Sequence, residues 1–462
     1  MVELTIERVA YGGQGVARLG GLVLFVRGAI PGDRVTAQVT RKKKDYAEAK
    51  VKEILEPSSD RVEASCPYSG YCGGCQWQHV RYKGQLRYKK KLLEEAVSRI
   101  GSLSGVPVHD TTPSDKQFAY RNKMEFSFSD RRWFLSHEMD KTDAEQGFAL
   151  GLHIPGTFHK VLDVEACLLQ QERGNQILRE VKRYAKNSGI PAYGLKSHQG
   201  FWRFLTLRHA THFDEWMVNL ITSEVNQGAV EPLAEILCSR FDNVKSVVNN
   251  INTRKASIAV GEREIVLSGN GTIFDRIGPF SFQISANSFF QTNSLGAEKL
   301  YRKVEEYAGL DGSETVLDLY SGTATIPIFL AGHAKGIIGM EIMESAIHDA
   351  ELNCRANGIR NCRFILGDIR DNLRSLTIRP DVLIIDPPRA GMHKHVLAGV
   401  MELAPEKVVY VSCNPATMAR DMGQMSRDYE VVEIQPVDMF PHTYHVEAVA
   451  KLVRRKSSSP SS

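Results

Sequence analysis

Two short motifs place reactive side chains directly after apolar segments. Cys413 lies in "SCNP" after "VVYV", and Asp386 begins "DPPRAG" after "VLII". A cysteine beside a polar turn can accept hydrogen bonds from backbone amides, which lower its pKa and make it a nucleophile. Two prolines after a strand rigidify its exit, so Asp386 can be held ready to accept hydrogen bonds from a ligand. We interpret the cysteines Cys238, Cys354 and Cys362 as ordinary buried residues.

Three further acids follow other apolar segments: Asp318 near "YSG", then Glu341 and Asp368. The first loop has only Gly322 where a dinucleotide fingerprint has three glycines, so a pyrophosphate cradle is not expected. Glu341 lies 19 residues beyond Gly322, where a carboxylate can accept from both ribose hydroxyls. A nucleoside that carries a cationic centre and lacks a pyrophosphate describes S-adenosylmethionine. Helix capping is the alternative role of Asp368.

A methyl donor and a thiolate together indicate methylation of a carbon atom that needs activation. C5 of uracil is a poor nucleophile, and thiolate attack at C6 converts the ring to an enolate whose C5 accepts a methyl group. A base must then remove the C5 proton before the enzyme is released. The stretch "FPHTYHVEAV" offers His442, His445 and Glu447, and we favour Glu447.

The elements that position these residues alternate between strand and helix. From about Gln291 onward, apolar runs without alternation are separated by amphipathic segments, which is typical of a parallel sheet covered on both faces. We therefore predict an α/β fold with a Rossmann-like methyltransferase domain at 286–455. Its ligands are expected at the carboxyl ends of the strands.

The front of the chain follows other patterns. Residues 1–57 consist of short alternating runs broken by "YGGQG" and "IPGD", which predict a small oligonucleotide-binding-like β-barrel. We expect a mixed α+β middle domain with the cysteine-rich segment at 58–285, and a disordered tail at 456–462. One helix is predicted over 81–101, with an apolar stripe, lysines mainly elsewhere and Gly101 as its stop.

Composition predicts a chain without a membrane span. Its 462 residues are 24% charged and 42% apolar, and the amino terminus has no secretory signal, so we expect a cytoplasmic protein. The net charge is only +4, but basic runs at 41–45 and 81–91 are interleaved with tyrosines. Cationic and aromatic side chains together favour RNA over a merely solvated face.

Five motifs resemble those of the RNA uracil-C5 methyltransferases: "FQTN", "LDLYSG", "DPPRAG", "VSCNPATMARD" and "FPHTYHVEAV". The amino-terminal third resembles the large-subunit rRNA branch, with a barrel of the TRAM type. The resemblance implies the following roles: S-adenosylmethionine contacts from Gln291, Tyr320, Glu341 and Asp386, with Asp368 near the adenine; Cys413 as nucleophile; and Glu447 as base. The loop "SGTAT" departs from the family, because Ala324 replaces the usual glycine.

The spacing Cys66-x5-Cys72-x2-Cys75 gives three thiol ligands, one short of a tetrahedral site. In the rRNA branch, this spacing and a fourth cysteine in the middle domain hold a 4Fe–4S cluster, which implies Cys167 as the fourth ligand. Zinc is the alternative, with Cys167 or His79 closing the site. Because the reaction transfers no electron, the expected role of the cluster is structural.

These observations predict an enzyme that forms 5-methyluridine in structured RNA, acting as a monomer, with rRNA favoured over tRNA. Two alternatives remain open. One is an RNA-binding protein whose methyltransferase domain is inactive. The other is a methyltransferase for a different acceptor, such as a protein amide or an exocyclic base nitrogen, which would not need Cys413.

Overall fold

The computed structural model describes residues 1–135, 138 and 147–456, and it divides the chain into two compact units. Unit 1 comprises Met1–Ser65, Cys75–Asp115 and Gly296–Ser462, and unit 2 comprises Cys66–Gly74 and Lys116–Leu295. Both units are therefore discontinuous in sequence. Apart from Lys456, the tail predicted at 456–462 lies outside the described residues.

The amino-terminal domain (residues 1–57) of unit 1 is a six-stranded sheet with the order β1-β5-β6-β4-β3-β2. Alternating side chains such as Leu24, Val26 and Val35 fill its core. The basic run at 41–44 lies where β5 turns into β6, and these two strands pair antiparallel as a hairpin. The strands are β1 (Val2–Thr5), β2 (Arg8–Val9), β3 (Gly15–Leu19), β4 (Leu22–Arg27), β5 (Arg34–Lys42) and β6 (Tyr46–Glu56).

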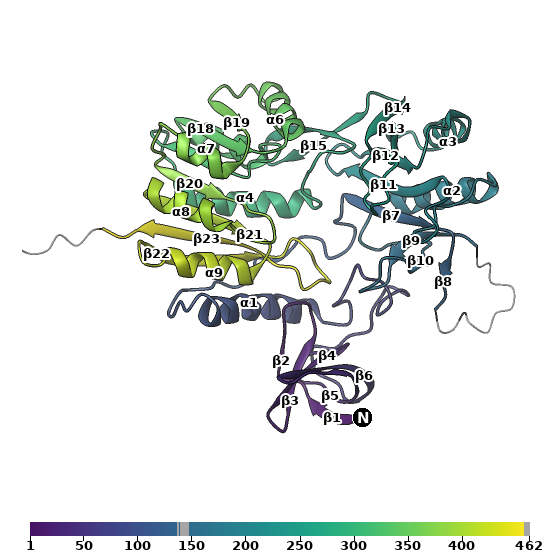
Figure 1. Cartoon of the computed structure of the whole chain (residues 1–462), viewed down its shortest axis with the longest axis horizontal. Coiled ribbons are helices and arrows are strands. Elements are labelled where there is room, and N and C mark those ends of the chain that lie inside the picture. Colours follow the sequence, from purple (N-terminus) through teal and green to yellow (C-terminus); the bar gives the residue numbers. More distant parts are fainter. Residues whose placement is uncertain (136–137, 139–146, 457–462) are drawn as a thin grey trace, which may run out of the picture. The chain divides into compact units, whose positions relative to one another are not determined.

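The second sheet of unit 1 has seven strands in the order β19-β18-β17-β20-β21-β23-β22 (Figure 1). Its first five strands are parallel, and β23 pairs antiparallel with both β21 and β22. This confirms the predicted Rossmann-like architecture. The strands are β17 (Thr315–Leu319), β18 (Gly336–Glu341), β19 (Cys362–Leu366), β20 (Val382–Ile385), β21 (Lys407–Ser412), β22 (Tyr429–Val437) and β23 (Glu447–Arg454).

Helices separate these strands, and an amino-terminal helix joins them. The helices are α4 (Ser294–Ala308), α5 (Thr325–Leu330), α6 (Glu344–Ala356), α7 (Ile369–Ser375), α8 (Lys394–Leu403), α9 (Pro415–Met425) and the short 3-10 turn Ala331–His333. Helix α1 (Tyr82–Arg99) shares a buried core with α9, to which Leu93 and Met422 both contribute. The end of α1 lies so close to α9 that a Cβ on Gly423 would come 2.6 Å from the Gly101 carbonyl oxygen.

One lysine of the basic helix α1 is not available to RNA, an exception that the expectation of lysines mainly off the buried face allows. Lys89 is fully buried. Its ammonium group donates to Asp438 Oδ1 at 2.5 Å and to the Phe440 carbonyl at 2.9 Å. Burial of two charges is tolerated here because they pair with each other. Lys89 therefore ties α1 to the loop between β22 and β23.

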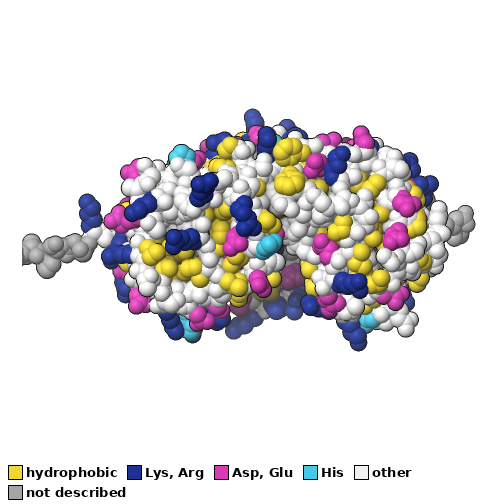
Figure 2. All heavy atoms as spheres, turned by 90° about the horizontal axis from the view of Figure 1, so that it is seen from above, with side chains coloured by type: hydrophobic (Ala, Val, Ile, Leu, Met, Phe, Trp, Pro, Cys, Tyr) yellow, Lys and Arg dark blue, Asp and Glu magenta, His cyan; other side chains and the backbone are white. Residues whose placement is uncertain are grey.

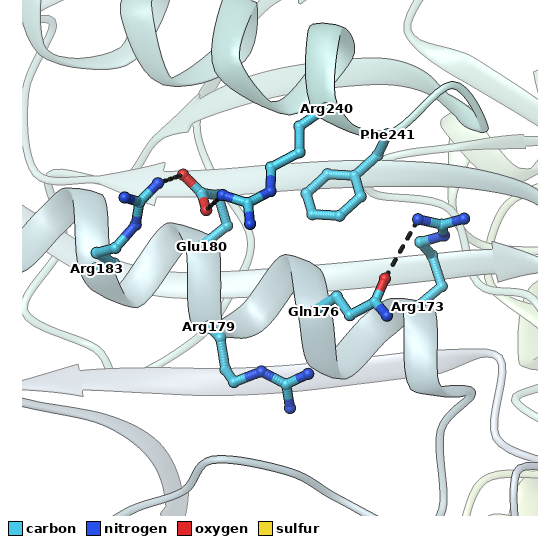
Figure 3. Close-up of a pocket in the computed structure, with 7 residues that line it drawn as sticks. All are labelled: Arg173, Gln176, Arg179, Glu180, Arg183, Arg240 and Phe241. Carbon is cyan, nitrogen blue, oxygen red and sulfur yellow. Dashed lines mark hydrogen bonds and ion pairs between the residues drawn. The ribbon is translucent and has the colours of Figure 1, made fainter.

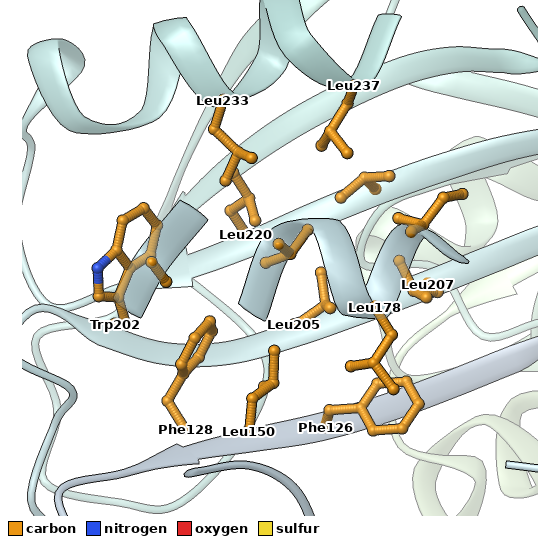
Figure 4. Packing of buried hydrophobic residues seen from close by; sticks show 14 of the residues in the cluster. Phe126, Phe128, Leu150, Leu178, Trp202, Leu205, Leu207, Leu220, Leu233 and Leu237 are labelled. Carbon is orange, nitrogen blue, oxygen red and sulfur yellow. The ribbon is translucent and has the colours of Figure 1, made fainter. Parts of the chain in front are cut away.

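Unit 2 contains an eight-stranded sheet with the order β14-β13-β12-β11-β7-β9-β10-β8 and a separate hairpin, β15–β16. The helices α2 (Glu172–Asn187) and α3 (Gln227–Arg240) pack on it through a core that includes Trp202, Leu205 and Leu233 (Figure 4). The strands are β7 (Lys123–Ser129), β8 (Arg132–Trp133), β9 (Ala149–His153), β10 (Val161–Asp163), β11 (Trp202–Ala210), β12 (Glu215–Thr222), β13 (Val244–Ile251), β14 (Arg263–Ser268), β15 (Thr272–Ile277) and β16 (Phe280–Ser285). This matches the predicted mixed α+β character.

The face shown in Figure 2 carries interspersed basic, acidic and apolar side chains rather than one field of positive charge. This face therefore offers no single broad basic surface to a polyanion. Within the described ranges, no helix has the length and apolar character needed to cross a membrane.

Candidate active site

The reactive residues follow adjacent strands of the seven-stranded sheet in unit 1. Cys413 follows β21, and Asp386 follows the neighbouring β20. Glu447 begins β23, which pairs with the other side of β21. The three side chains are close enough for the two carboxylates to raise the pKa of the Cys413 thiol. The predicted nucleophile and base therefore lie in one cluster.

Hydrogen bonds hold the "SCNP" and "DPPRAG" turns against each other. The Asn414 side chain caps α9 by accepting from the Ala416 amide, and Pro415 occupies the first turn, where its missing N–H costs nothing. Asn414 Nδ2 also donates to the Arg389 carbonyl at 2.9 Å. Thr417 Oγ1 donates to the same carbonyl at 3.3 Å. These bonds fix Cys413 relative to Arg389.

The Cys413 thiol is half-buried, and its pKa is raised to about 11. Burial is the main cause, and the negative charges of Glu447 and Asp386 add to it. A hydrogen bond and the positive charge of Arg389 act in the opposite direction. The pKa of this thiol is thus raised rather than lowered as expected from the polar turn, although Arg389 favours the thiolate.

Glu447 is half-buried, and its pKa is raised to about 8 by burial and by Asp386, against the effects of Arg389 and Lys89. Near neutral pH it exchanges protons readily, as a general base must. His442 is committed elsewhere, because its amide donates to Gln85 Oε1 at 2.7 Å and its Nδ1 lies 3.2 Å from Gln85 Nε2. This geometry favours Glu447 over His442 as the base.

A second group of acids surrounds the start of the loop after β17. Glu341 ends β18, and its carboxylate accepts from the backbone amides of Gly322 at 3.0 Å, Ile342 at 2.8 Å and Met343 at 2.9 Å. These bonds orient the carboxylate and leave it further acceptor positions. A Cβ on Gly322 would meet nothing within 4 Å, so the space in front of this loop is open.

Asp318 is a buried carboxyl group with an unsatisfied oxygen atom. It is buried, its Oδ1 has no hydrogen-bond partner, and its pKa is raised well above the ordinary value by burial and by Asp386 and Glu341. The hydroxyl of Ser321, which is also buried, has no partner either. Unsatisfied buried acceptors among mutually repelling carboxylates indicate a site for a cationic ligand with hydrogen-bond donors.

The loop between β17 and α5 contains two non-glycine residues with left-handed backbone. Tyr320 has φ 67°, and Ala324, the amino-terminal cap of α5, has φ 63°. Such conformations cost about 1 kcal/mol or more for residues other than glycine and cluster at ligand sites. Glycine would adopt the Ala324 conformation without strain, so its absence leaves a strained turn at this position.

Two other predicted contacts lie in different surroundings. Asp368 caps α7 by accepting from the Arg370 amide at 2.9 Å, and its pKa is lowered to about 2, chiefly by hydrogen bonds from the Arg370 side chain. The capping alternative thus describes its present role. Gln291 belongs to unit 2, where its carbonyl accepts from Asn122 Nδ2 at 3.0 Å. Their contacts with a cofactor stay predictions.

The sequence of this chain was compared with protein families and with related proteins. Residues 372–455 match the family described as tRNA (Uracil-5-)-methyltransferase, and residues 1–52 match the TRAM domain. An uncharacterized RNA methyltransferase of Chlorobaculum tepidum is 42% identical over 93% of this chain and 91% of its own length. Another from Porphyromonas gingivalis is 40% identical over 98% and 99%.

A solved structure matches across the same length. The tRNA (uracil-54, C5)-methyltransferase of Pyrococcus abyssi, in complex with S-adenosyl-L-homocysteine, has a TM-score of 0.75 and 30% identity, covering 98% of this chain and 99% of that one. The chain belongs to the RNA uracil-C5 methyltransferase family. It is therefore an RNA methyltransferase that uses S-adenosylmethionine, as the motifs predicted.

The acids of this uracil-C5 methyltransferase fit that cofactor. Glu341 has acceptor positions left for ribose hydroxyls, while Asp318 and Ser321 offer unsatisfied oxygens. Asp386, whose pKa burial raises to about 6, adds a further carboxylate to the same group. The sulfonium of S-adenosylmethionine would offset the repulsion among these acids. Asp318 and Arg389 lie inside the sequence motifs, but the sequence predicted specific roles only for residues near them. Their burial and their charged neighbours depend on the folded structure, which the motifs do not reveal.

Replacing Asp318 with asparagine tests this assignment. We expect the affinity for S-adenosylmethionine to fall about 10-fold or more, the usual cost of losing a hydrogen bond to a charged group. The melting temperature of the protein without cofactor should stay equal or rise, since one repelling carboxylate is gone. Calorimetric titration and thermal denaturation measure both effects, with the exposed Asp371→Asn as control. A destabilised variant with normal cofactor affinity would contradict the assignment.

The cysteines predicted to hold a cluster are only partly assembled in unit 2 of the methyltransferase. Cys66, Cys72 and Cys167 are near enough to influence one another, and burial raises the pKa of each thiol. Cys75 is assigned to unit 1. Within the ranges that the structure describes, no three His, Cys, Asp or Glu side chains form a metal site. The 4Fe–4S and zinc predictions therefore gain no support here, and His79 lies beside Arg61 and Asp33 in unit 1.

Unit 2 of the methyltransferase also has an arginine-lined groove of about 530 Å³ between α2 and the end of α3 (Figure 3). Glu180, at its centre, is buried and paired with Arg183 and Arg240. Arg173 lies 5.6 Å from the centroid of the Phe241 ring. The full lining comprises Arg173, Gln176, Arg179, Glu180, Arg183, Arg240 and Phe241. The lining thus has four arginines and one carboxylate, although Arg179 pairs with Glu172 outside the lining at 2.7 Å.

Proposed function

We propose that this protein methylates C5 of a uridine in structured RNA, with Cys413 as nucleophile and Glu447 as base. The observation that carries the proposal is the cluster after β20 and β21. There the Arg389 side chain hydrogen-bonds the Cys413 thiol, and Glu447 is close enough for its charge to affect the pKa of that thiol. Methylation of an exocyclic nitrogen or a protein amide needs no thiol at this position. An inactive methyltransferase domain would not need both the Cys413 thiol and the Glu447 carboxylate in this cluster.

The residues divide the reaction as follows. Arg389 stabilises the Cys413 thiolate, whose sulfur bonds to C6 of uracil while the electron pair of the 5,6 double bond moves into the enolate. When bound, S-adenosylmethionine would supply an electrophilic methyl group, which C5 accepts as the bond from that group to sulfur breaks and S-adenosylhomocysteine is left. Glu447 then takes the C5 proton, the double bond re-forms, and the bond between sulfur and C6 breaks.

We further propose rRNA as the substrate, on the resemblance of the amino-terminal third to the rRNA branch. The competing substrate is tRNA, which the Pyrococcus abyssi neighbour methylates at uracil 54 according to its description. Mapping 5-methyluridine across total RNA from a deletion strain decides between them. We expect loss at one or two rRNA uridines, and an altered tRNA beside unchanged rRNA would overturn this choice. That the protein is a cytoplasmic monomer stays a prediction.

Purified enzyme provides the direct test of the reaction. Incubation with S-adenosylmethionine and unmodified rRNA or tRNA transcripts should produce 5-methyluridine, detected by nucleoside mass spectrometry. RNA containing 5-fluorouridine should give a covalent complex, because fluorine at C5 cannot be removed as a proton. Methylation of another atom, or no complex with either RNA, would refute the proposal.

We also propose that Cys66, Cys72, Cys75 and Cys167 hold a 4Fe–4S cluster that fixes this segment. Cys75 is three residues from Cys72, which limits their Cα separation to about 11 Å. The Cys75 thiol can therefore reach a cluster that Cys72 binds. Protein purified without oxygen should contain about four iron and four sulfide per chain. The Cys167→Ser variant should lose them, whereas Cys238→Ser should not. Stoichiometric zinc without sulfide would favour the zinc alternative.

The arginine groove of unit 2 supplies a candidate binding place for RNA phosphates. Replacing Arg173 and Arg179 with glutamine removes two positive charges, of which that of Arg179 pairs with Glu172, and leaves the two arginines that pair with Glu180. We expect about 10-fold weaker RNA binding and a salt dependence shallower by about one for each phosphate that these arginines neutralise. The matched control is Arg254→Gln with Arg263→Gln, two exposed positions of the same unit. Equal salt slopes in the two double variants would exclude the groove.

A further inference from the structure

A side chain of the amino-terminal domain reaches the backbone of the catalytic cysteine. Tyr11 lies in the turn between β2 and β3, and its hydroxyl donates to the Cys413 carbonyl at 3.4 Å. Its ring meets the Tyr444 ring edge-on, with centroids 5.3 Å apart. Both tyrosines belong to unit 1, as does Cys413. A residue from the first strands of the chain thus borders the reacting thiol.

The turn that carries Tyr11 is firmly docked. Gly13 has φ 82°, and its carbonyl accepts from the buried indole N–H of Trp77 at 3.2 Å. A Cβ on Gly13 would lie 3.2 Å from that indole nitrogen and 3.3 Å from Tyr444 Cδ1. The Trp77 amide in turn donates to the carbonyl of His442, in the loop before Glu447. Tyr11 is therefore held in position relative to the catalytic loop.

Tyr11 nevertheless keeps a free surface. The residue is 41% exposed, although its hydroxyl is bonded at the site. Burial and the nearby Tyr444 and Cys413 raise the pKa of its phenol to about 12, so the group stays neutral. Glu447 and Arg389 also act on that phenol, which puts it among the reacting groups. An exposed, fixed aromatic face beside a nucleophile suits a flat, neutral ring that must be presented to it.

We infer that the ring of Tyr11, braced by Tyr444, stacks on the target uracil and holds its C6 at the Cys413 sulfur. This inference rests on the proposed function and adds a positioning role for the amino-terminal domain. A base that reacts with the enzyme must leave its helical stack, and an aromatic face replaces the stacking of its former neighbours. Tyr11 is a substrate-contacting residue in this account, and it transfers no proton.

Three substitutions separate the ring from the hydroxyl. Tyr11→Phe keeps the ring, Tyr11→Leu keeps the apolar volume without an aromatic face, and Phe213→Leu is the control at another aromatic that is 41% exposed. The rate of covalent complex formation with RNA containing 5-fluorouridine reports base positioning. Tyr11→Leu should lower this rate about 10-fold or more, the range expected for loss of one base–aromatic stack, while Tyr11→Phe and the control stay near wild type.

Two further measurements guard against a merely structural effect. Affinity for S-adenosylmethionine should be unchanged in Tyr11→Leu, and its melting temperature should stay close to that of wild type, because leucine keeps an apolar contact with Tyr444. Equal rates for the Phe and Leu variants, whether normal or reduced, would overturn the stacking role. If wild-type protein itself forms no complex, the proposed function fails instead, so the two failures are distinguishable.

Discussion

Replacing Cys413 with serine is expected to abolish methylation, with a loss of at least about 10³-fold in kcat. A serine hydroxyl is far less ionised than a thiol, even one whose pKa burial has raised to about 11, so attack at C6 is lost. Binding of RNA and of S-adenosylmethionine should persist, because Cys413 serves neither. Methyl incorporation from labelled cofactor and equilibrium binding measure the two effects.

The matched control is Cys238→Ser in unit 2, where Cys238 Sγ only donates to Ser268 Oγ at 3.3 Å. This variant should methylate normally and form the covalent complex with 5-fluorouridine RNA. Cys413→Ser should form none. A complex that survives the Cys413 substitution would identify a different nucleophile.

Replacing Glu447 with glutamine should have a different signature: turnover falls about 10²- to 10⁴-fold, but the covalent complex builds up with ordinary uridine. Attack and methyl transfer precede the step that needs the base, so the methylated adduct forms and cannot be released. Denaturing gels with labelled RNA and cofactor should show one band carrying both labels. His442→Gln is a weaker control, because it disturbs the bonds to Gln85, and Glu430→Gln on the exposed face of β22 is the better one.

The dependence of turnover on pH should also identify Glu447 as the base. The folded pKa of Glu447 is raised from 4.5 to about 8, so the fraction of ionised base increases as pH rises through 8. Wild-type turnover should therefore climb between about pH 7 and 9, and the Gln variant should lack that inflection. Because the folded state holds this proton more tightly, the stabilisation from Glu447 is full below 4.5 and is lost as pH passes 8. A wild-type profile that is flat across this range would exclude Glu447 as the base.

The sequence was sufficient for the sheet and for the identity of the strand-end residues. Apolar runs without alternation predicted parallel strands, and each strand end then located a side chain such as Asp386 or Cys413. The sequence was not sufficient to predict which charged groups are buried or which of them affect one another. The effect of Arg389 on the thiol and the burial of Lys89 depend on residues far apart in the chain, which no local pattern encodes.

The pairing of Lys89 with Asp438 has a consequence for how this enzyme can be divided. The catalytic loop is held by a cation from a helix more than three hundred positions earlier, and Gln85 bonds the same loop. Truncation before α4 would remove these partners and would also uncover core residues such as Met422, which pack with Leu93 of α1. The segment from α4 to the carboxyl terminus is therefore not expected to fold stably without α1.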